Sequence, residues 1–383
     1  MTQRTHAKRV LFISLQCIPA DDLPYSVTTR EMLKRSSYSG TYIVLGIALF
    51  VALIASAGVG AFSFSPETMA RHIAAGLGWV TEGKSDTLAR NVFLQLRLPR
   101  VFLAALTGAV LGVSGTLMQG IFRNPIVEPG LAGTSAGAAF GASLVFVFGS
   151  TSALTRPLGS LAVPVLAFAG AFAATMLVYR VSRSFGKVNV FTLLLAGIAV
   201  NAVCGAGTGF LSYIARDPQA RNITFWNLGT FTTADWRGVE MVGIAFAGCF
   251  AIAMRYGKSL NALMLGEDEA ALLGAEPEKL ILRLIIVNTV MVAVATAMVG
   301  VIAFVGLVIP HVLRMLKSSD YTFLIPASAL LGAVMMCVVD IVARVIVPPA
   351  ELPVGIITAV VGAPVFLWVL LRQQRLGAAS FYG

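Results

Sequence analysis

Charged residues are scarce in this chain. Of its 383 residues, 12% are Asp, Glu, Lys or Arg and 57% are hydrophobic, whereas soluble domains average about 25% charged residues. So little polar surface cannot cover a water-soluble body of this size. The composition therefore excludes a soluble globular protein and predicts an all-α polytopic membrane protein.

Side chains and motifs that support catalysis or metal binding are equally rare. The three histidines are isolated from one another in the sequence, and none of the four cysteines forms a Cys-x-x-Cys pair. The cysteines are therefore expected to be small buried residues. No Gly-rich phosphate loop of the Walker type is present, so the chain cannot hydrolyse ATP by that mechanism. We predict neither enzymatic activity nor a metal or cofactor in this chain.

Ionisable residues are also missing from the middle of the long apolar runs. Asp340 and Glu351 are expected near the outer ends of their helices. Proton- or sodium-coupled carriers usually hold ionisable groups at mid-membrane, so an ion-coupled secondary carrier is the weaker alternative. If transport is active, its energy must come from a partner. The net charge of +10 does not indicate nucleic-acid binding, because the basic residues are scattered between apolar runs.

Runs of roughly the 20 apolar residues that span a bilayer recur along the chain. They predict about ten transmembrane helices in a domain of residues 37–374, between a polar, irregular N-terminal tail, 1–36, and a C-terminal tail, 375–383. The runs lie near 41–63, 98–118, 131–150, 158–179, 190–214, 238–255, 281–303, 305–316, 324–345 and 353–371. The run 305–316 is short and contains Pro310, so we expect a broken or kinked helix there.

The distribution of basic residues predicts the orientation in the membrane. An even number of spans places both termini on the same side. If that side is the cytoplasm, 18 of the 28 Lys and Arg residues fall in inside segments. Cytoplasmic segments of membrane proteins carry an excess of basic residues. We therefore expect both tails in the cytoplasm, with 255–279 as the longest inner loop.

Small residues recur at helical spacing. Gly108 and Gly112 form one such pair, and Gly137 and Gly141 form another. Pairs of this kind let helix backbones approach closely, so we expect tight packing within the chain. Between the first two spans, residues 66–77 are expected to form a short interfacial helix.

The inner loop contains a predicted short helix at residues 265–274. Gly266 can begin it, the acidic residues 267–269 suit the positive end of its dipole, and Gly274 can end it. We expect one face to carry Ala270, Leu272 and Leu273. A short amphipathic helix can fill a groove on another protein, and a surface turn without a partner is the alternative on pattern alone.

A series of motifs in a fixed order resembles the vitamin B12, iron-siderophore and haem importer permeases, the FecCD-type family of ABC importers. The motifs are Arg97-Leu-Pro-Arg100, Ser114-Gly115, Gln119, Asn124-Pro125, Glu128-Pro-Gly130, Gly133-x-Ser135-x-Gly137, Leu194-Leu-Ala-Gly197, Leu265-Gly-Glu, Gly274, Phe304-Val-Gly-Leu-Val-Ile-Pro-His311, Arg314, Asp340-Ile-Val-Ala-Arg344, Glu351-Leu-Pro-x-Gly355 and Gly362-Ala-Pro-Val-Phe366. The resemblance covers about residues 40–372 and leaves the N-terminal tail uncovered.

The resemblance implies a type II ABC importer permease with ten transmembrane helices in the bacterial inner membrane. Such permeases act as homodimers in the lipid bilayer. Each dimer carries two cytoplasmic ATPase subunits, which bind ATP and Mg, and receives its cargo from a periplasmic binding protein. The chain itself is then a transport subunit and not an enzyme.

The resemblance also implies roles for particular residues. Arginines at the positions of Arg97 and Arg344 pair with carboxylates of the binding protein, and Arg100 lies at the same outer mouth. The expected cytoplasmic gate comprises Asn124, Pro125, Ile126, Val190 and Phe191. The expected ATPase-coupling segment comprises Leu265, Gly266, Glu267, Glu269, Leu272 and Gly274.

The sequence also suggests which cargo is transported. Haem, ferric siderophores and cobalamin are all carried by relatives of this family. The gate positions Val190 and Phe191 are apolar and aromatic, which suits a flat apolar macrocycle. We therefore expect haem, with a ferric siderophore or cobalamin as alternatives.

Overall fold

Backbone hydrogen bonding dictates the architecture of this chain. A segment that crosses lipid must satisfy each N–H and C=O internally, and a helix does so within one segment. The computed structural model describes residues 38–60, 63–79, 87–149, 155–184, 187–348 and 350–379. The predicted tail at 1–36 lies outside these ranges. The described residues from Tyr42 onward belong to one compact unit, Tyr42–Gly383.

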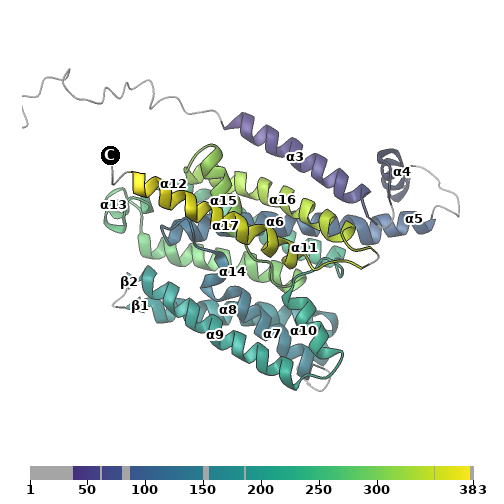
Figure 1. The fold of residues 1–383 in the computed structure, drawn as a ribbon, viewed down its shortest axis with the longest axis horizontal. Coiled ribbons are helices and arrows are strands. Elements are labelled where there is room, and N and C mark those ends of the chain that lie inside the picture. Colours follow the sequence, from purple (N-terminus) through teal and green to yellow (C-terminus); the bar gives the residue numbers. More distant parts are fainter. Residues whose placement is uncertain are drawn as a thin grey trace, which may run out of the picture. The chain divides into compact units, whose positions relative to one another are not determined.

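The described elements are almost all helical (Figure 1). In chain order they are α3 (Ser39–Gly58), α4 (Pro66–Gly76), α5 (Thr87–Asn91), the π-helical turn η2 (Val92–Arg97), α6 (Leu98–Ile121), η3 (Pro129–Ala132), α7 (Thr134–Phe148), η4 (Arg156–Leu161), α8 (Ala162–Ser182), β1 (Arg183–Ser184), β2 (Lys187–Val188), α9 (Val190–Ile214), α10 (Gln219–Asn227), α11 (Trp236–Arg255), α12 (Gly257–Leu263), α13 (Glu267–Leu272), α14 (Pro277–Val299), α15 (Val305–Leu316), α16 (Tyr321–Val345) and α17 (Val354–Ala379). The two short strands pair antiparallel between α8 and α9.

The predicted apolar helices are confirmed. Seven helices of the described ranges are long and apolar enough to cross a membrane, and three shorter apolar helices occupy the other predicted runs. The predicted interfacial helix is α4, whose first turn is capped by Ser65. Side-chain caps also fix the starts of α9, α11 and α16, where Asn189, Asp235 and Asp320 accept bonds from backbone N–H groups.

The short helices α7 and α15 reach only part of the way through a bilayer. They contain 15 and 12 residues, or about 22 Å and 18 Å, against a hydrocarbon core of about 30 Å. The prediction of a helix break at Pro310 is wrong. Pro310 lies inside a continuous α15, and the backbone leaves the helical conformation at residues 300–304 instead. Non-helical backbone at membrane depth is tolerated where protein or a cavity surrounds it.

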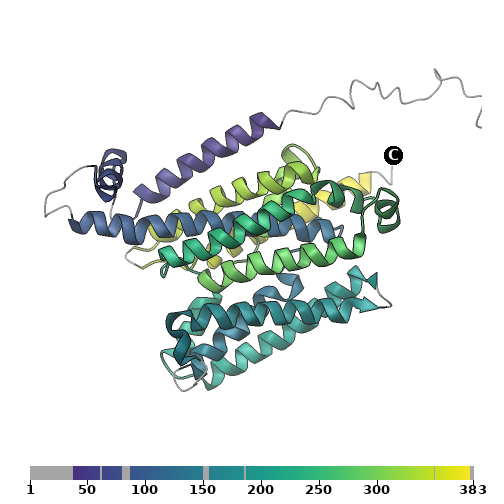
Figure 2. The same ribbon diagram turned by 180° about the vertical axis from the view of Figure 1, so that it is seen from behind.

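Helix α6 is the centre of the packing. It contacts α11, α14, α15 and α16, and most of its residues from Thr107 to Ile121 are buried. Seen from the front and from behind, α7, α8 and α9 lie together on one side of α14, and α6, α15, α16 and α17 lie on the other (Figures 1 and 2). The segment joining the predicted outer arginines to the predicted inner gate is therefore also the core of the fold.

Glycines allow α6 to touch its neighbours backbone to backbone. A Cβ added to Gly108 would lie 2.1 Å from the carbonyl oxygen of Gly332, and one on Gly115 would lie 1.7 Å from that of Gly306. A Cβ on Gly137 in α7 would meet the carbonyl oxygen of Gly170 in α8 at 2.4 Å. The prediction that these small residues serve packing within the chain is confirmed.

Buried polar side chains add specific bonds between the same helices. Ser114 Oγ of α6 donates to Asn288 Oδ1 of α14 at 2.5 Å. Thr116 Oγ1 donates to Ser328 Oγ of α16 at 2.8 Å. Each bond satisfies groups that would otherwise be costly in an apolar interior, so it fixes the register of α6 against its partner helix.

Gly115→Ala should destabilise the protein by at least about 2 kcal/mol, because the new methyl group meets backbone that cannot move aside. Thermal unfolding in detergent measures the change. The matched control is Gly46→Ala in α3, where a Cβ meets no atom within 4 Å; helix propensity alone should make it neutral or slightly stabilising. Equal melting temperatures for the two variants would contradict the close-contact argument.

Candidate transport site and the polar clusters at its two ends

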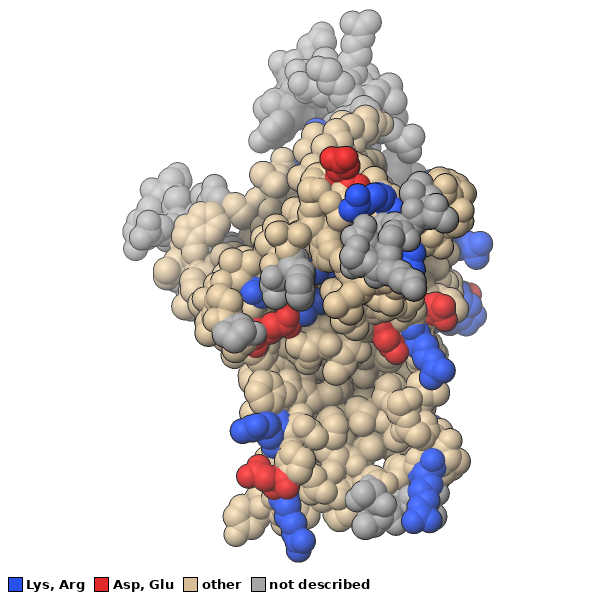
Figure 3. Space-filling view, turned by 90° about the vertical axis from the view of Figure 1, so that its right-hand side faces the viewer, with Lys and Arg blue, Asp and Glu red and all other residues tan. Residues whose placement is uncertain are grey.

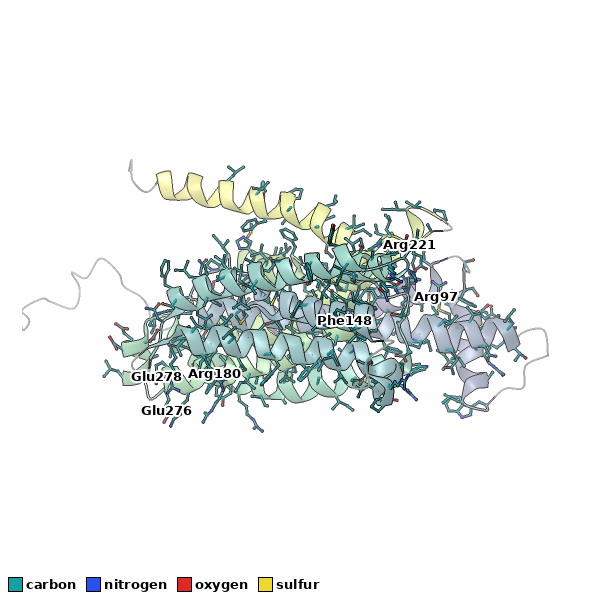
Figure 4. The ribbon with its side chains drawn as sticks, turned by 90° about the horizontal axis from the view of Figure 1, so that it is seen from below. Arg97, Phe148, Arg180, Arg221, Glu276 and Glu278 are labelled. Carbon is teal, nitrogen blue, oxygen red and sulfur yellow. The ribbon has the colours of Figure 1, made fainter. Side chains whose placement is uncertain are left out.

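Charged residues mark two opposite ends of the helical unit. Figure 4 places Arg97 and Arg221 toward one end, and Arg180, Glu276 and Glu278 toward the other. We call these the α4 end and the α13 end, after the helices that lie there in Figure 1. Figure 3 looks onto the α4 end, where acidic and basic side chains both reach the surface. Arg97, one of the predicted docking residues, therefore lies at the end opposite to α13, the helix in the predicted coupling segment.

The predicted docking arginines meet two acidic residues at the α4 end. Arg100 Nε donates to Asp340 Oδ1 at 2.9 Å, and Arg100 Nη1 donates to Glu351 Oε2 at 2.7 Å. Arg344 Nη2 lies 3.0 Å from the second oxygen of Asp340. Because Asp340 is fully buried, its charge requires these two partners.

Arg97 and Arg344 both reach over the end of α3. Arg97 Nη1 and Arg344 Nη1 donate to the carbonyl oxygen of Val59 at 2.5 Å and 2.6 Å. Arg344 Nη2 also donates to the carbonyl oxygen of Ser56 at 3.0 Å. Carbonyl groups at a helix C-terminus lack helical partners and carry partial negative charge, so cations are favourable there.

The structure thus brings the three arginines together at the α4 end and shows what they contact. Arg97 is 8% exposed and Arg344 is 7% exposed, so both side chains turn inward. Other arginines of the segments around α10 and α11, including Arg216, Arg221 and Arg237, are exposed. The docking role of Arg97, Arg100 and Arg344 stays a prediction.

The predicted gate begins where α6 ends. Arg123 adopts a left-handed conformation with φ of 51°, which turns the chain out of the helix. Asn124 N donates to the carbonyl oxygen of Gln119, and Asn124 Oδ1 accepts from Ile126 N at 3.0 Å. The side chain of Gln119 bonds to Arg314 and to the first carbonyl groups of α15. These bonds give the turn a defined geometry.

The two predicted gate segments meet at one hollow of about 610 Å³ at the α13 end. It is lined by Phe122, Arg123, Asn124, Val127, Val188, Asn189, Val190, Phe191, Leu194 and Glu267. Phe191 is 70% exposed, so its ring is available to whatever occupies this space. Pro125 and Ile126 line a separate small cavity with His311 and Phe366.

The predicted coupling segment forms a helix of its own. The helix is α13, Glu267–Leu272, and Gly266 and Gly274 flank it with φ of 135° and 83°. The expected apolar face is wrong in one respect. Ala270 is fully buried, whereas Leu272 and Leu273 are 89% and 66% exposed. The exposed face is therefore the pair of leucines, and Ala270 packs the helix against the rest of the protein.

A cavity near the middle of the helices was missed by the sequence analysis. Its volume is about 400 Å³, and it lies between α7, α9 and the non-helical backbone before α15. Its polar lining comprises Glu128, Ser135, Asn201, Thr208 and Asn227. Asn201 Nδ2 donates to the carbonyl oxygen of Gly130 at 3.1 Å. An Asn in the middle of the apolar run 190–214 was the available signal.

Glu128 fixes the wall of this cavity. Its Oε1 accepts from the backbone N–H of Phe304 at 2.8 Å, at the positive end of α15. Phe304 itself has φ of 67°. The carboxylate thus holds the start of a helix that begins inside the molecule. Broken helices of this kind surround the substrate sites of many transporters.

Known proteins share both the sequence and this fold. The model of the FecCD transport family matches residues 48–372.

The chain belongs to the FecCD transport family. It is 39% identical over 329 residues to the hemin transport system permease protein HmuU of Yersinia pestis, covering 86% of this chain and 94% of that one. It is 37% identical over 305 residues to the vitamin B12 import system permease protein BtuC of Salmonella typhi, covering 79% and 91%. A solved metal-chelate type ABC transporter in an inward-facing conformation matches with a TM-score of 0.75 and 31% identity, covering 88% of this chain and all of that one.

Membership of the FecCD family settles the class of protein. The chain is the permease of an ABC importer, a multi-pass protein of the inner membrane with the type II fold. It is a transport subunit and not an enzyme, because separate ATPases hydrolyse ATP in this family. The ion-coupled carrier considered from the sequence is thereby excluded.

Asp340→Asn should cost this FecCD permease about 3 kcal/mol of stability, because it leaves the buried guanidinium group of Arg344 without a counter-charge and leaves Arg100 with Glu351 alone. The control is Glu351→Gln, whose carboxylate is 34% exposed and should cost under about 1 kcal/mol. Denaturant unfolding in detergent compares the two. A larger loss for Glu351→Gln would show that Asp340 is not the centre of the cluster.

Proposed function

We propose that this permease moves haem from the periplasm to the cytoplasm by alternating access. The observation that carries the proposal is the hollow at the α13 end, whose wall combines the exposed ring of Phe191 with Phe122, Val190 and Leu194. A flat apolar macrocycle gains more from such a wall than a polar chelate does. The similarity to the hemin permease of Yersinia pestis supports the same cargo. Ferric siderophores and cobalamin are the competing cargoes.

The α13 end is proposed to face the cytoplasm. Exposed basic residues gather there at the helix ends, among them Arg183, Arg255, Lys258, Lys279 and Lys317. Their distribution follows the positive-inside rule. This orientation puts α4 and the arginine cluster in the periplasm, and it places the C-terminal tail, together with the N-terminal tail, in the cytoplasm.

The working importer is proposed to contain two copies of this chain, two cytoplasmic ATPase subunits with ATP and Mg, and a periplasmic binding protein. Exposed apolar residues cover much of α3, α9 and α11, and lipid and the second copy would share these faces. Leu272, the last residue of α13, and Leu273, which follows it, would offer an apolar pair to a groove on the ATPase. Carboxylates of the binding protein would engage Arg97, Arg100 and Arg344.

Transport would proceed through the two cavities. Cargo released at the α4 end would pass the polar cavity around Asn201 and then the hollow at Phe191. The segments of Asn124–Ile126 and Val190–Phe191 would close the inner end. Nucleotide binding to the ATPases would move α13 and change which end is open, since coupling requires that nucleotide bind the two states unequally.

The cargo is tested with the complete importer in proteoliposomes, supplied in turn with haem, cobalamin and a ferric siderophore on the cognate binding protein. We expect ATP-dependent uptake of haem, and a Soret band from the loaded binding protein. Uptake of cobalamin or the siderophore without uptake of haem would overturn the haem proposal. Uptake that needs no ATPase would overturn the proposed energy source.

Leu272→Asp should weaken assembly with the ATPase subunits by at least about tenfold, because it puts a charge at the centre of an apolar contact. Co-purification and binding by light scattering measure the assembly. Leu77→Asp is the matched control, since Leu77 is 60% exposed and follows α4 at the opposite end. Equal affinity in the two variants would remove α13 from the ATPase interface.

A further inference from the structure

An ion pair joins the gate turn to the coupling helix. Arg123 Nη2 lies 2.9 Å from Glu267 Oε1. Arg123 directly precedes Asn124, the first residue of the predicted gate, and Glu267 is the first residue of α13. The two residues are 144 positions apart. Both line the hollow that also contains Phe191.

Each partner lies at or next to a residue where the backbone leaves the ordinary helical conformation. Arg123 is the left-handed residue at which the chain leaves α6, and the following N–H of Asn124 is bonded back to Gln119. Glu267 follows Gly266, whose φ of 135° is a conformation that suits glycine. Displacement of α13 would therefore act on the gate turn through this contact, while the end of α6 stays anchored by Gln119.

We propose that the Arg123–Glu267 ion pair is the link that transmits movement of α13 to the gate turn at Asn124–Ile126. The inference rests on the proposed function of α13 and of the gate, and it does not depend on the cargo. Arg123 and Glu267 act as positioning residues, since they transmit a displacement and need not touch what is transported.

The exposure of the pair suits a contact that is made and broken. The side chains of Arg123 and Glu267 are 35% and 30% exposed. Ion pairs in contact with water contribute little to stability and are weakened by salt. Loss of the pair should therefore leave the fold intact and reduce the coupling between α13 and the gate.

A reporter in the gate tests the link without any cargo. Ile126→Cys is placed in a background in which Cys17, Cys204, Cys249 and Cys337 are replaced by Ala, and the complete importer is reconstituted. The rate of maleimide labelling at position 126 is measured with and without a non-hydrolysable ATP analogue. In the parent, nucleotide should change this rate, and the ratio of the two rates measures coupling.

Arg123→Glu and Glu267→Arg should each lower the nucleotide-dependent ratio by about fivefold, the lower end of typical coupling between sites. The double exchange, Arg123→Glu with Glu267→Arg, should restore it, which loss of structure cannot explain. The control exchanges Glu276 and Lys279, an ion pair at 3.0 Å with side chains more than 60% exposed, and should leave the ratio unchanged.

The outcomes separate this inference from the proposed function. If nucleotide changes labelling equally in the parent and in both single variants, the ion pair is not the link. The same conclusion follows if the double exchange fails to restore the ratio. If nucleotide leaves labelling unchanged even in the parent, the proposed roles of α13 and the gate fall together with the pair.

Discussion

The direct contact of α6 with its neighbours through bare backbone is the constraint on which the rest of the structure depends. Lipid supplies no hydrophobic drive for two apolar helices to associate, so close van der Waals contact and a few hydrogen bonds must hold them. Gly108, Gly112 and Gly115 allow that contact along one helix face. Ser114 and Thr116 add hydrogen bonds beside the glycines. A rigid central helix is the result, with one predicted site at each of its ends.

The interrupted helices pack around this central helix and are held at defined points. Helix α15 begins inside the molecule, held by Glu128 at Phe304 and by Gln119 at its first carbonyl groups. The non-helical residues 300–304 leave space for the polar cavity near Asn201. Because α6 is buried along most of its length, the proposed movement is assigned to the turns beyond it. The fold thus separates a fixed scaffold from the segments proposed to act as gates.

The local sequence pattern predicted the helices well, since the formation of a helix depends on residues close in the sequence. The apolar runs located the ten long or short apolar helices found in the described residues, and acidic residues between Gly266 and Gly274 located α13. Small-residue spacing predicted the close contacts of Gly108 and Gly137. The predicted position of the helix break was wrong. The prediction relied on Pro310, whereas the chain leaves the helix at Gly300, which has a φ of 78°. Pro310 lies inside α15, and the side chain of Gln119 bonds to the carbonyl group of Gly306 that the missing N–H of Pro310 leaves free.

Contacts between distant parts of the chain could not be predicted in the same way. Arg100 meets Asp340 across 240 positions, and Arg344 meets Val59 across 285. The sequence placed these arginines at one end but gave no sign that they turn inward. Likewise, helical spacing could not tell which face of α9 carries Asn201 toward a cavity. The polar lining of that cavity therefore became visible only with the fold.

Arg97 and Arg344, which both bond to the carbonyl oxygen of Val59 after α3, would affect the lifetime of a complex with a docked protein. Their guanidinium groups already have acceptors at Val59, Ser56 and Asp340. A carboxylate from outside would have to compete with these acceptors, so each new contact gains only the difference between two good bonds. In the proposed docking, the field of the cluster would orient the binding protein, and the competition for the guanidinium groups would favour its release. Such release would suit an importer that exchanges an emptied binding protein for a loaded one in each cycle.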